Sequence, residues 1–365
     1  MVGARPQFVK LAPVARAMAE SPRPITDAIV HTGQHYDESM SKIFFDELEI
    51  PRPSVNLGVG SGPQGAQTAR MLEGIERYLL ESRPHAVVVY GDTNSTLAGG
   101  LAAAKLHIPV VHVEAGLRSY NRQMPEELNR IITDHLSRLL CAPTQTAMAN
   151  LAGEGLASRA QLSGDVMYDA VLFSARLAAA RPDSLRVCGL APGQFGVATV
   201  HRAENTAPQE LRTLMQALND AAEQFGHIVF PMHPRTAAML RDGVSDWRPA
   251  RQLQIVEPLS YLDMLALVSN ARFVLTDSGG LQKEAYFLGR PCITLRDETE
   301  WVETLAGGAN QIAGSDGSRL LEMLGRVSEP PRSAATATAA DGPFGDGHAA
   351  RRIVEAICDL CEQRQ

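Results

Sequence analysis

The stretch that decides the fold lies in the second half of the chain and reads Phe273-Val274-Leu275-Thr276-Asp277-Ser278-Gly279-Gly280-Leu281-Gln282-Lys283-Glu284. Its first four residues form a short apolar run, which is typical of a buried parallel strand. The residues that follow carry the pattern of a helix, which we expect over Gly280–Leu288. A strand that turns directly into a helix is the unit from which parallel α/β sheets are built.

The turn between this strand and this helix has the chemistry of an anion site. Backbone N–H groups at a helix start lack helical partners, and the helix dipole adds partial positive charge. Glycines let a phosphate approach those groups closely, so Ser278, Gly279 and Gly280 are candidates for a diphosphate cradle. Glu284, about one helical turn further on, is placed to accept from ribose hydroxyls. The alternative is that Asp277 or Ser278 caps the helix and the glycines only make a tight turn.

The same alternation of strand and helix extends over most of the chain and predicts βαβ units with open parallel sheets. The P-loop pattern is absent, as is Gly-x-Gly-x-x-Gly after the first strand, which argues against a P-loop nucleotidase and weakens a dinucleotide fold. Strands are expected at Thr26–Thr32, Ala86–Tyr90, Val110–Val113, Phe195–Val200, Ile228–Met232, Leu253–Val256, Phe273–Thr276 and Cys292–Leu295. Helices are expected at Gly65–Glu81, Ser95–Leu106, Glu126–Leu136, Gln209–Gln224, Tyr261–Ser269 and Gly280–Leu288.

The alternation falls into two blocks, which predict two doubly wound α/β domains facing a cleft. The N-terminal domain spans 1–165, with a tail helix at 349–365 that packs back on it, and the C-terminal domain spans 166–348. An Ala-rich helix over 167–181 bridges the two, and a surface loop is expected at 332–342. Ligands of such sheets bind outside the carboxyl ends of the strands.

Composition narrows the classes of function. The 365 residues include 34 Lys or Arg and 41 Asp or Glu, a formal net charge of −7, and 45% of them are hydrophobic. Such a chain is neither disordered nor a general nucleic-acid binder, and no apolar run reaches the length of a membrane span. Five scattered cysteines and the lack of a signal-peptide pattern favour the cytoplasm. Cys358 and Cys361 form a C-x-x-C without a second ligand pair, so we expect no metal site.

Polar and ionisable residues recur at the ends of the predicted strands in both blocks. A histidine there is usually a hydrogen-bonded structural residue, but these residues gather where α/β domains bind ligands. Positive charge within an acidic protein suits a phosphorylated substrate. The cations are Arg5, His201, Arg202, His233 and Arg235, and the acids of the first block are Asp92, Glu114, Glu126 and Glu127.

Glu126 and Arg130 are spaced to share one face of a helix. The structural interpretation is a surface ion pair, worth well under about 1 kcal/mol. The functional interpretation is a carboxylate held near the cleft and tuned for proton transfer.

These motifs resemble those of the bacterial non-hydrolysing UDP-N-acetylglucosamine 2-epimerases, and the resemblance covers essentially the whole chain. The motifs that carry it are Gly3-x-Arg5-Pro6, Gly33-Gln34-His35, Gly91-Asp92-Thr93, His112-Val113-Glu114-Ala115-Gly116-Leu117-Arg118, Pro125-Glu126-Glu127-x-Asn129-Arg130, His201-Arg202-x-Glu204-Asn205, His233-Pro234 and Asp277-Ser278-Gly279-Gly280-x-Gln282-x-Glu284. The resemblance implies the GT-B architecture, with two Rossmann-like domains and a cleft between them, and a homodimer. It also implies interconversion of UDP-GlcNAc and UDP-ManNAc without NAD or metal, for cell-surface polysaccharide precursors. UDP leaves by anti elimination to give a 2-acetamidoglucal and then adds back.

The resemblance also assigns roles to residues. The C2 proton of the sugar is weakly acidic and must leave one face and return to the other, which calls for several acid–base groups. The leaving diphosphate calls for cations and helix-dipole stabilisation. The acid–base positions of the family fall on Asp92, Glu114, Glu126 and His201, with Arg130 as an active-site arginine. Its UDP-binding positions fall on Arg5, Lys10, His233, Ser278, Gly279, Gly280 and Glu284.

The chain departs from the common family pattern at several points. The opening at residues 3–7, Gly-Ala-Arg-Pro-Gln, replaces Gly-Thr-Arg-Pro-Glu. This opening, with residues 124–127 and 164–169, looks more like the branch that acts on UDP-2,3-diacetamido-2,3-dideoxyglucuronate. Ala203 replaces an arginine. Asp37 stands where substrate-regulated members carry a second glutamine, which weakens the case for activation by UDP-GlcNAc.

The start of the chain carries a further expectation. Only Met1 and Val2 precede Gly3, where relatives carry a short β-branched run. The first strand of the sheet is therefore either absent or the start is placed late. If the strand is missing, Arg5 and Lys10 lose the element that positions them.

Three alternatives to the epimerase remain at the level of sequence. A hydrolysing relative would let water reach the glucal and release free ManNAc and UDP. A GT-B glycosyltransferase would need an acceptor and would show no exchange at C2. A nucleotide-sugar-binding protein would have lost its catalytic acids, and the presence of Asp92, Glu114, Glu126 and His201 counts against this class.

Overall fold

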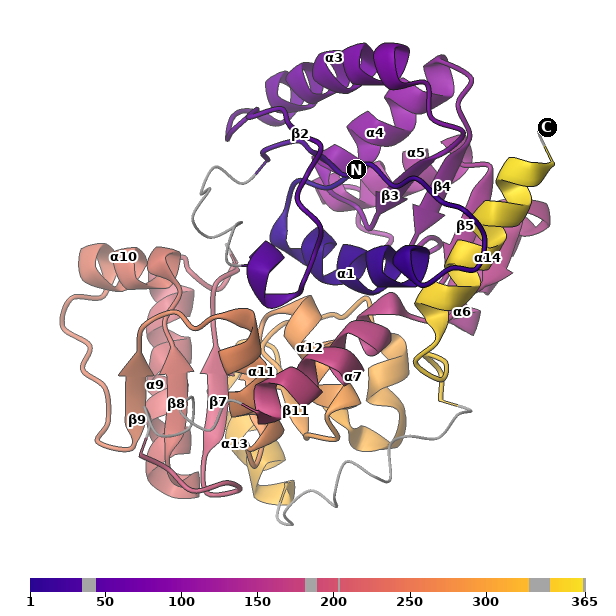
Figure 1. Cartoon of the computed structure of the whole chain (residues 1–365). Coiled ribbons are helices and arrows are strands. Elements are labelled where there is room, and N and C mark those ends of the chain that lie inside the picture. The colour runs from indigo at the N-terminus through magenta and orange to yellow at the C-terminus, as the bar shows by residue number, and fades with distance from the viewer. Residues whose placement is uncertain (35–43, 181–188, 203, 328–341, 364–365) are drawn as a thin grey trace. The chain divides into compact units, whose positions relative to one another are not determined.

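The computed structural model describes residues 1–34, 44–180, 189–202, 204–327 and 342–363. The chain divides into two compact units (Figure 1). Unit 1 comprises Met1–Ala170 and Ala340–Gln365, and unit 2 comprises Val171–Ala339. Asp37, Ala203 and all but the last residue of the expected loop at 332–342 lie outside the described residues.

Unit 1 is built on parallel strands, as the alternation of strand and helix predicts. Four strands pair in the order β3-β4-β5-β6, and two more pair as β1-β2. All four residues of β4 are buried, as expected for a short β-branched strand covered on both faces. The strands are β1 Val30–His31, β2 Val55–Asn56, β3 Val87–Tyr90, β4 Val110–Val113, β5 Leu139–Ala142 and β6 Ala160–Leu162.

Val2 stands where a first strand is expected. It forms a parallel bridge with His31, and its N–H donates to the Val30 carbonyl at 3.0 Å. On its other side, the Met1 α-amino group donates to the carbonyl of Val88 in β3 at 2.9 Å. These contacts join β1 to β3 through residues 1–2, so α1 begins from an anchored position.

The described helices of unit 1 include two that the sequence analysis does not predict, α1 (Arg5–Ala19) and α6 (Gln145–Gly153). Arg5-Pro6 looks like a loop, but a proline fits the first turn of a helix, and α1 starts there with Phe8 and Val14 fully buried. The tail helix α14 packs against α1 (Figure 1). The helices are α1 Arg5–Ala19, α3 Gln64–Ser82, α4 Asn94–Lys105, α5 Pro125–Leu136, α6 Gln145–Gly153, η1 Ala157–Arg159 and α14 Ala349–Glu362. Helix α7, Val166–Ala179, begins in unit 1 and continues into unit 2.

Unit 2 contains a six-stranded parallel sheet in the order β12-β11-β10-β7-β8-β9. The chain runs outward from β7 to β9, returns to β10 beside β7, and runs outward again to β12. This reversal is the doubly wound order of a Rossmann sheet, whose ligands bind at the strand ends beside the reversal, here those of β7 and β10. The strands are β7 Gly196–Thr199, β8 Ile228–Pro231, β9 Leu253–Val256, β10 Val274–Thr276, β11 Cys292–Thr294 and β12 Asn310–Ile312.

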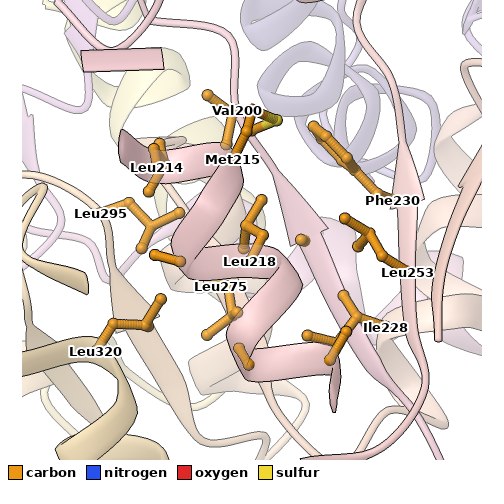
Figure 2. Packing of buried hydrophobic residues seen from close by; sticks show 14 of the residues in the cluster. Val200, Leu214, Met215, Leu218, Ile228, Phe230, Leu253, Leu275, Leu295 and Leu320 are labelled. Atoms are coloured by element: carbon orange, nitrogen blue, oxygen red, sulfur yellow. The ribbon is translucent and has the colours of Figure 1, made fainter. Parts of the chain in front are cut away.

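A buried cluster packs α9, α10 and α13 against this sheet. Figure 2 shows Leu214, Met215 and Leu218 of α9 among strand residues such as Phe230 and Leu275, and all five are at most 1% exposed. The helices are α9 Pro208–Phe225, α10 Pro234–Gly243, α11 Tyr261–Ser269, α12 Gly279–Phe287, η2 Val302–Gly308 and α13 Gly317–Arg326. None of the described helices combines the length and the apolar character needed to cross a membrane.

Candidate active site

Two candidate acids follow neighbouring strands of unit 1. Asp92 comes just after β3 and Glu114 directly after β4. Lys10 of α1 pairs with the Glu114 carboxylate, and the two side chains are only 8% and 3% exposed. Gly91 leaves room for this pair, because a Cβ there would lie 2.9 Å from Lys10 Nζ. Lys10, which the resemblance assigns to UDP binding, is therefore in direct contact with a candidate acid.

The second acid has its own cation. Nη2 of Arg130 lies 2.5 Å from Oδ2 of Asp92, whose side chain is 28% exposed. The Asn129 side chain donates to the backbone carbonyl of Asp92 at 2.9 Å. Helix α5 thus fixes both the backbone and the carboxylate of Asp92 while leaving the carboxylate accessible.

The structure gives Arg130 a different glutamate partner from the one that the i, i+4 spacing suggests. Nη1 of Arg130 donates to Oε2 of the buried Glu127 at 3.1 Å, whereas Glu126 is exposed. Glu127 also accepts from the N–H groups of Ser119 and Tyr120, each at 2.9 Å. Glu127 holds the preceding loop and Arg130 together, and Glu126 is left accessible at the start of α5.

Gln7 anchors the opening motif and was not singled out as a site residue. Its carbonyl oxygen accepts from the N–H groups of Gly3 and Ala4 at 2.8 and 3.1 Å. Its amide donates to the carbonyl of Tyr90, the last residue of β3, at 3.0 Å. A glutamate, which the common family opening has here, could not make that donation when ionised. Arg5, at the first turn of α1, lies over the ring of Phe44 at 5.7 Å.

The glycine turn of unit 2 begins α12. The Ser278 hydroxyl accepts from the N–H of Leu281 at 3.4 Å, so Ser278 is the N-cap. A Cβ on Gly279 would lie 2.5 Å from Oε1 of Glu300, whereas a Cβ on Gly280 would meet only the Ser278 hydroxyl at 3.9 Å. Packing therefore explains the glycine at 279 but not the one at 280, where the approach is open.

Asp277, at the carboxyl end of β10, organises the end of β7. Its Oδ2 accepts from the N–H groups of His201 and Arg202, both at 2.9 Å, and from the Asn205 side chain at 3.2 Å. Nδ1 of His201 lies 2.9 Å from Oδ1 of Asp277. Burial acts to raise the pKa of Asp277, but the His201 hydrogen bond and these N–H groups bring that pKa below its ordinary value. The ionised Asp277 thus orients an imidazole that is 37% exposed.

A second imidazole lies beside His201. His233 follows β8, and its Nδ1 accepts from the N–H of Arg235 at 3.2 Å as the N-cap of α10. The centroids of the two rings are 5.6 Å apart. The ends of β7 and β8 therefore place two imidazoles together in unit 2.

The inner side of α12 carries buried charge. Burial raises the pKa of Glu284 to about 7, while Lys283 and the Tyr261 hydroxyl act in the opposite direction. Nζ of the fully buried Lys283 lies 3.6 Å from the centroid of the Trp301 ring. Lys283 and Trp301 were not among the predicted site residues, and no motif around Trp301 pointed to it.

Metal-ligating side chains do not gather in the described part of the chain. No group of three or more His, Cys, Asp or Glu residues there is arranged to hold a metal ion. Cys358 and Cys361 lie on α14 and form no disulfide. The described residues offer carboxylates and imidazoles for proton transfer, and cations and helix N–H groups for an anion.

The chain is similar to known sugar-nucleotide epimerases over nearly its full length. It is 46% identical to the UDP-N-acetylglucosamine 2-epimerase homolog of Methanococcus maripaludis and 44% identical to the UDP-2,3-diacetamido-2,3-dideoxy-D-glucuronate 2-epimerase of Pseudomonas aeruginosa, with 99% of both chains covered in each case. The structure of Methanocaldococcus jannaschii UDP-GlcNAc 2-epimerase in complex with UDP-GlcNAc and UDP matches with a TM-score of 0.89 and 40% identity, covering 98% of each chain. That of the Neisseria meningitidis enzyme bound to UDP-GlcNAc matches with a TM-score of 0.88, 29% identity and the same coverage.

A family model agrees with these matches. The model described as UDP-N-acetylglucosamine 2-epimerase matches residues 17–358. The resemblance drawn from the motifs is therefore confirmed, together with the α/β class and the GT-B type of its two Rossmann-like domains. The chain belongs to the UDP-N-acetylglucosamine 2-epimerase family and is an isomerase.

Proposed function

We propose that the chain interconverts the two C2 epimers of a UDP-2-acetamido sugar, either UDP-GlcNAc and UDP-ManNAc or their 2,3-diacetamido-glucuronate equivalents, without hydrolysing the product. The observation that carries this proposal is the pair of carboxylates Asp92 and Glu114, placed after neighbouring strands and each held by its own cation. Relatives at 46% and 44% identity bear the names of both substrate classes, so substrate choice is part of the test.

The proposed reaction is an elimination followed by its reverse on the other face. A carboxylate removes the C2 proton, the C1–O bond breaks, and UDP departs with the bonding pair to leave a 2-acetamidoglucal. A proton then returns to C2 from the opposite face while UDP adds back to C1. The reaction needs neither an oxidant nor a reductant, because a proton and UDP leave the sugar and a proton and UDP are added back. We assign this proton transfer to Asp92, Glu114, Glu126 and His201, with Arg130 orienting Asp92.

The departing diphosphate needs stabilisation as its charge grows. The start of α12 supports a role for Ser278, Gly279 and Gly280, because N–H groups at a helix start favour an anion and Gly280 leaves room for one. His233 lies beside His201 and adds a polar ring at the same strand ends. We assign Glu284 to the ribose hydroxyls, and Arg5 and Lys10 to positive charge that favours UDP.

We also propose the wider setting of this activity. The functional domains are 1–165 with the tail helix 349–365, and 166–348, a division that the two compact units support. We propose a cytoplasmic homodimer that makes precursors of cell-surface polysaccharide. Leu128 and Ile132, 45% and 42% exposed and one turn apart on α5, support an interface there. Sedimentation at several concentrations tests the dimer, and a monomer at all of them would contradict it.

The decisive experiment follows exchange at C2. The protein is incubated in D2O with UDP-GlcNAc and, separately, with the UDP-diacetamido-glucuronate, and C2 is followed by NMR. Deuterium at C2 together with the epimeric UDP-sugar supports the proposal and identifies the substrate. Free ManNAc with UDP would instead indicate the hydrolysing reaction, and acceptor-dependent release of UDP without exchange would indicate a glycosyltransferase. No exchange with either substrate would overturn the proposal.

A further inference from the structure

A buried histidine connects the two turns that carry the candidate carboxylates of unit 1. His112 lies on β4, and its side chain is 0% exposed. Its Nδ1 lies 2.7 Å from Oδ1 of Asp134, and its Nε2 lies 2.7 Å from the carbonyl oxygen of Gly91, the residue before Asp92. The other oxygen of Asp134 accepts from the N–H of Gly116 at 3.2 Å, in the turn that follows β4. Two side chains thus join both turns to α5.

Both ring nitrogens of His112 face atoms that only accept hydrogen bonds. A backbone carbonyl oxygen has no proton to give, and neither has an ionised carboxylate. A neutral imidazole carries a proton on one nitrogen, so one of the two 2.7 Å contacts would oppose two lone pairs. The imidazolium donates at both nitrogens and satisfies both contacts.

The charges around this pair balance when His112 is protonated. Independently of His112, the Asp134 carboxylate contacts the Arg118 guanidinium and accepts from the N–H of Gly116, and both donors favour its ionised form. Nη1 of Arg118 lies 2.8 Å from Asp134, and Nε of Arg118 donates to Glu154 at 2.7 Å. Arg118 is thus shared between Asp134 and Glu154, and Glu154 also lies 3.3 Å from Nε2 of His135 and is 30% exposed. At the fully buried Asp134, an imidazolium at His112 supplies the second positive charge in direct contact.

Among the described residues, the titratable groups close to His112 on the neighbouring elements are neutral or paired. On β5, burial raises the pKa of the Cys141 thiol to about 12, and on β3 it raises the pKa of Tyr90 well above its ordinary value, so both are neutral. From α1, Lys10 reaches the same strand ends but pairs with Glu114. The protonated His112 then donates to the carbonyl of Gly91, in the turn of Asp92, and to the carboxylate of Asp134, which holds the turn of Glu114.

We propose that His112 is a positioning residue, held as an imidazolium, that with Asp134 fixes the turns of Asp92 and Glu114. The inference rests on the proposed function for its catalytic consequence. Glu114 has a φ of +70°, a left-handed conformation that non-glycine residues adopt rarely and that the surrounding structure must hold. The Gly116 N–H bond to Asp134, two residues along, is one of the contacts that hold it.

The charge of His112 is tested by NMR on the full chain. Imidazolium and the two neutral tautomers have different ¹⁵N shifts and different two-bond couplings to the ring protons. His31 is the internal reference, because it is also buried in unit 1, but its Nδ1 accepts from the N–H of Gly33 at 2.9 Å and so carries no proton. We expect imidazolium shifts for His112 and neutral shifts for His31 under the conditions of the activity assay. Neutral shifts for His112 would overturn the proposal.

The catalytic consequence is tested with His112→Gln, which keeps a neutral donor but removes the charge. Loss of a nearby positive charge raises the pKa of a carboxylate base, so the acidic limb of the kcat–pH profile should move to higher pH. We expect kcat to fall by at least about tenfold, with KM changing much less, because positioning affects the transition state more than the bound substrate. His31→Gln is the matched control and should leave the position of the acidic limb where it is. A profile for His112→Gln that coincides with that of the unsubstituted chain would overturn the positioning role.

The two tests separate this inference from the proposed function. If the chain shows no C2 exchange with either UDP-sugar, the proposed function fails, while the NMR measurement still decides whether His112 is an imidazolium. If exchange is seen and His112 is neutral, only the present inference fails. Thermal unfolding of both glutamine variants shows whether a loss of rate follows from a loss of fold.

Discussion

Asp92 is held from two sides, by the guanidinium of Arg130 at 2.5 Å and by the Asn129 amide on its backbone carbonyl. Asp92→Asn keeps the shape of the side chain but removes a base. We expect kcat to fall by roughly 10²–10⁴-fold, the usual contribution of acid–base catalysis, with UDP binding retained. Turnover and calorimetric titration with UDP check the two parts. Asp246→Asn, a change at an exposed aspartate of unit 2, is the control and should leave kcat unchanged. Full activity of Asp92→Asn would remove Asp92 from the mechanism.

Glu284 should make UDP binding depend on pH. Burial raises its pKa to about 7, against an ordinary value of 4.5. Ribose hydroxyls donate to the carboxylate form, so UDP affinity should weaken as pH falls through about 7, and binding should release a proton. Calorimetry in buffers of different ionisation enthalpy measures that proton. Glu284→Gln should bind more weakly and without the pH dependence, and an equal pH dependence in this variant would rule the assignment out.

The same shift of pKa has a consequence for stability. A raised pKa in the folded state means that the stabilising contribution of Glu284 is present below about 4.5 and is lost as pH rises through about 7. The free energy of unfolding of Glu284→Gln should therefore fall less over this interval than that of the unsubstituted chain. Urea unfolding at several pH values measures the difference.

The residues that the sequence identified are those whose chemistry can be seen in a motif. Asp92 and Glu114 stand out because they follow the carboxyl ends of predicted strands, where α/β domains bind ligands. The i, i+4 spacing predicts Glu126 as the partner of Arg130, whereas Glu127 makes that contact, because helical spacing does not show which of two adjacent glutamates turns inward. Local sequence predicts Asp277 only as a possible cap, because its role depends on His201 and Asn205, which are more than seventy residues away. Contacts of this kind follow from sheet order rather than from local sequence.

At the scale of the element, the two glycines at the start of α12 should respond differently to substitution, because Gly279 is required for packing and Gly280 is proposed to be required for UDP binding. A Cβ on Gly279 would displace Glu300, which Arg296 holds at 2.9 Å, so Gly279→Ala should cost about 1–3 kcal/mol of the free energy of unfolding. A Cβ on Gly280 meets only the Ser278 hydroxyl at 3.9 Å, so Gly280→Ala should be neutral or stabilising by up to about 1 kcal/mol. If the diphosphate approaches there, Gly280→Ala should nevertheless weaken UDP binding by about tenfold or more.

Urea unfolding and titration with UDP measure these two quantities on the same proteins. Gly325→Ala is a control on α13, since a Cβ there meets nothing within 4 Å and the helix lies outside the turn. It should leave UDP affinity unchanged. Unchanged UDP affinity in Gly280→Ala would contradict the cradle and leave Ser278 as a helix cap alone.

Helices and strands could be predicted from the sequence where the residue types strongly favour one kind of element. β4, β9 and α11 have the predicted bounds, because runs such as Val-Val-His-Val are strongly strand-like. β5 was not predicted, because Leu-Leu-Cys-Ala lacks β-branched residues and becomes a strand through pairing with β4. β12, Asn-Gln-Ile, is polar and short and is likewise defined by its neighbour β11. The position of Val2 depends in the same way on contacts with β1 and β3, which no local pattern announces.

At the scale of the whole molecule, each unit has a hydrophobic core of its own. In unit 1, α3 and α4 pack on β3 and β4 through residues such as Met71, Ile75 and Leu79. In unit 2, α9 packs on the six-stranded sheet through residues such as Leu214 and Leu218 (Figure 2). These two clusters share no residue. Because burial of apolar surface is the dominant favourable term in folding, each unit can have its own free energy of unfolding.

Leu79 and Leu218 are matched probes of these cores, at 1% and 0% exposure and each on a helix facing a parallel sheet. Leu→Ala at a buried site removes apolar contact and leaves a cavity, so each substitution should cost about 2–5 kcal/mol of the free energy of unfolding. Because the cores are separate, Leu79→Ala should lower the melting temperature of one calorimetric transition and Leu218→Ala that of another. Leu80→Ala, at a side chain 56% exposed beside Leu79, is the control and should move neither. A single transition that both core substitutions shift equally would show that the two units unfold together, and the division into domains would then describe their packing but not their folding.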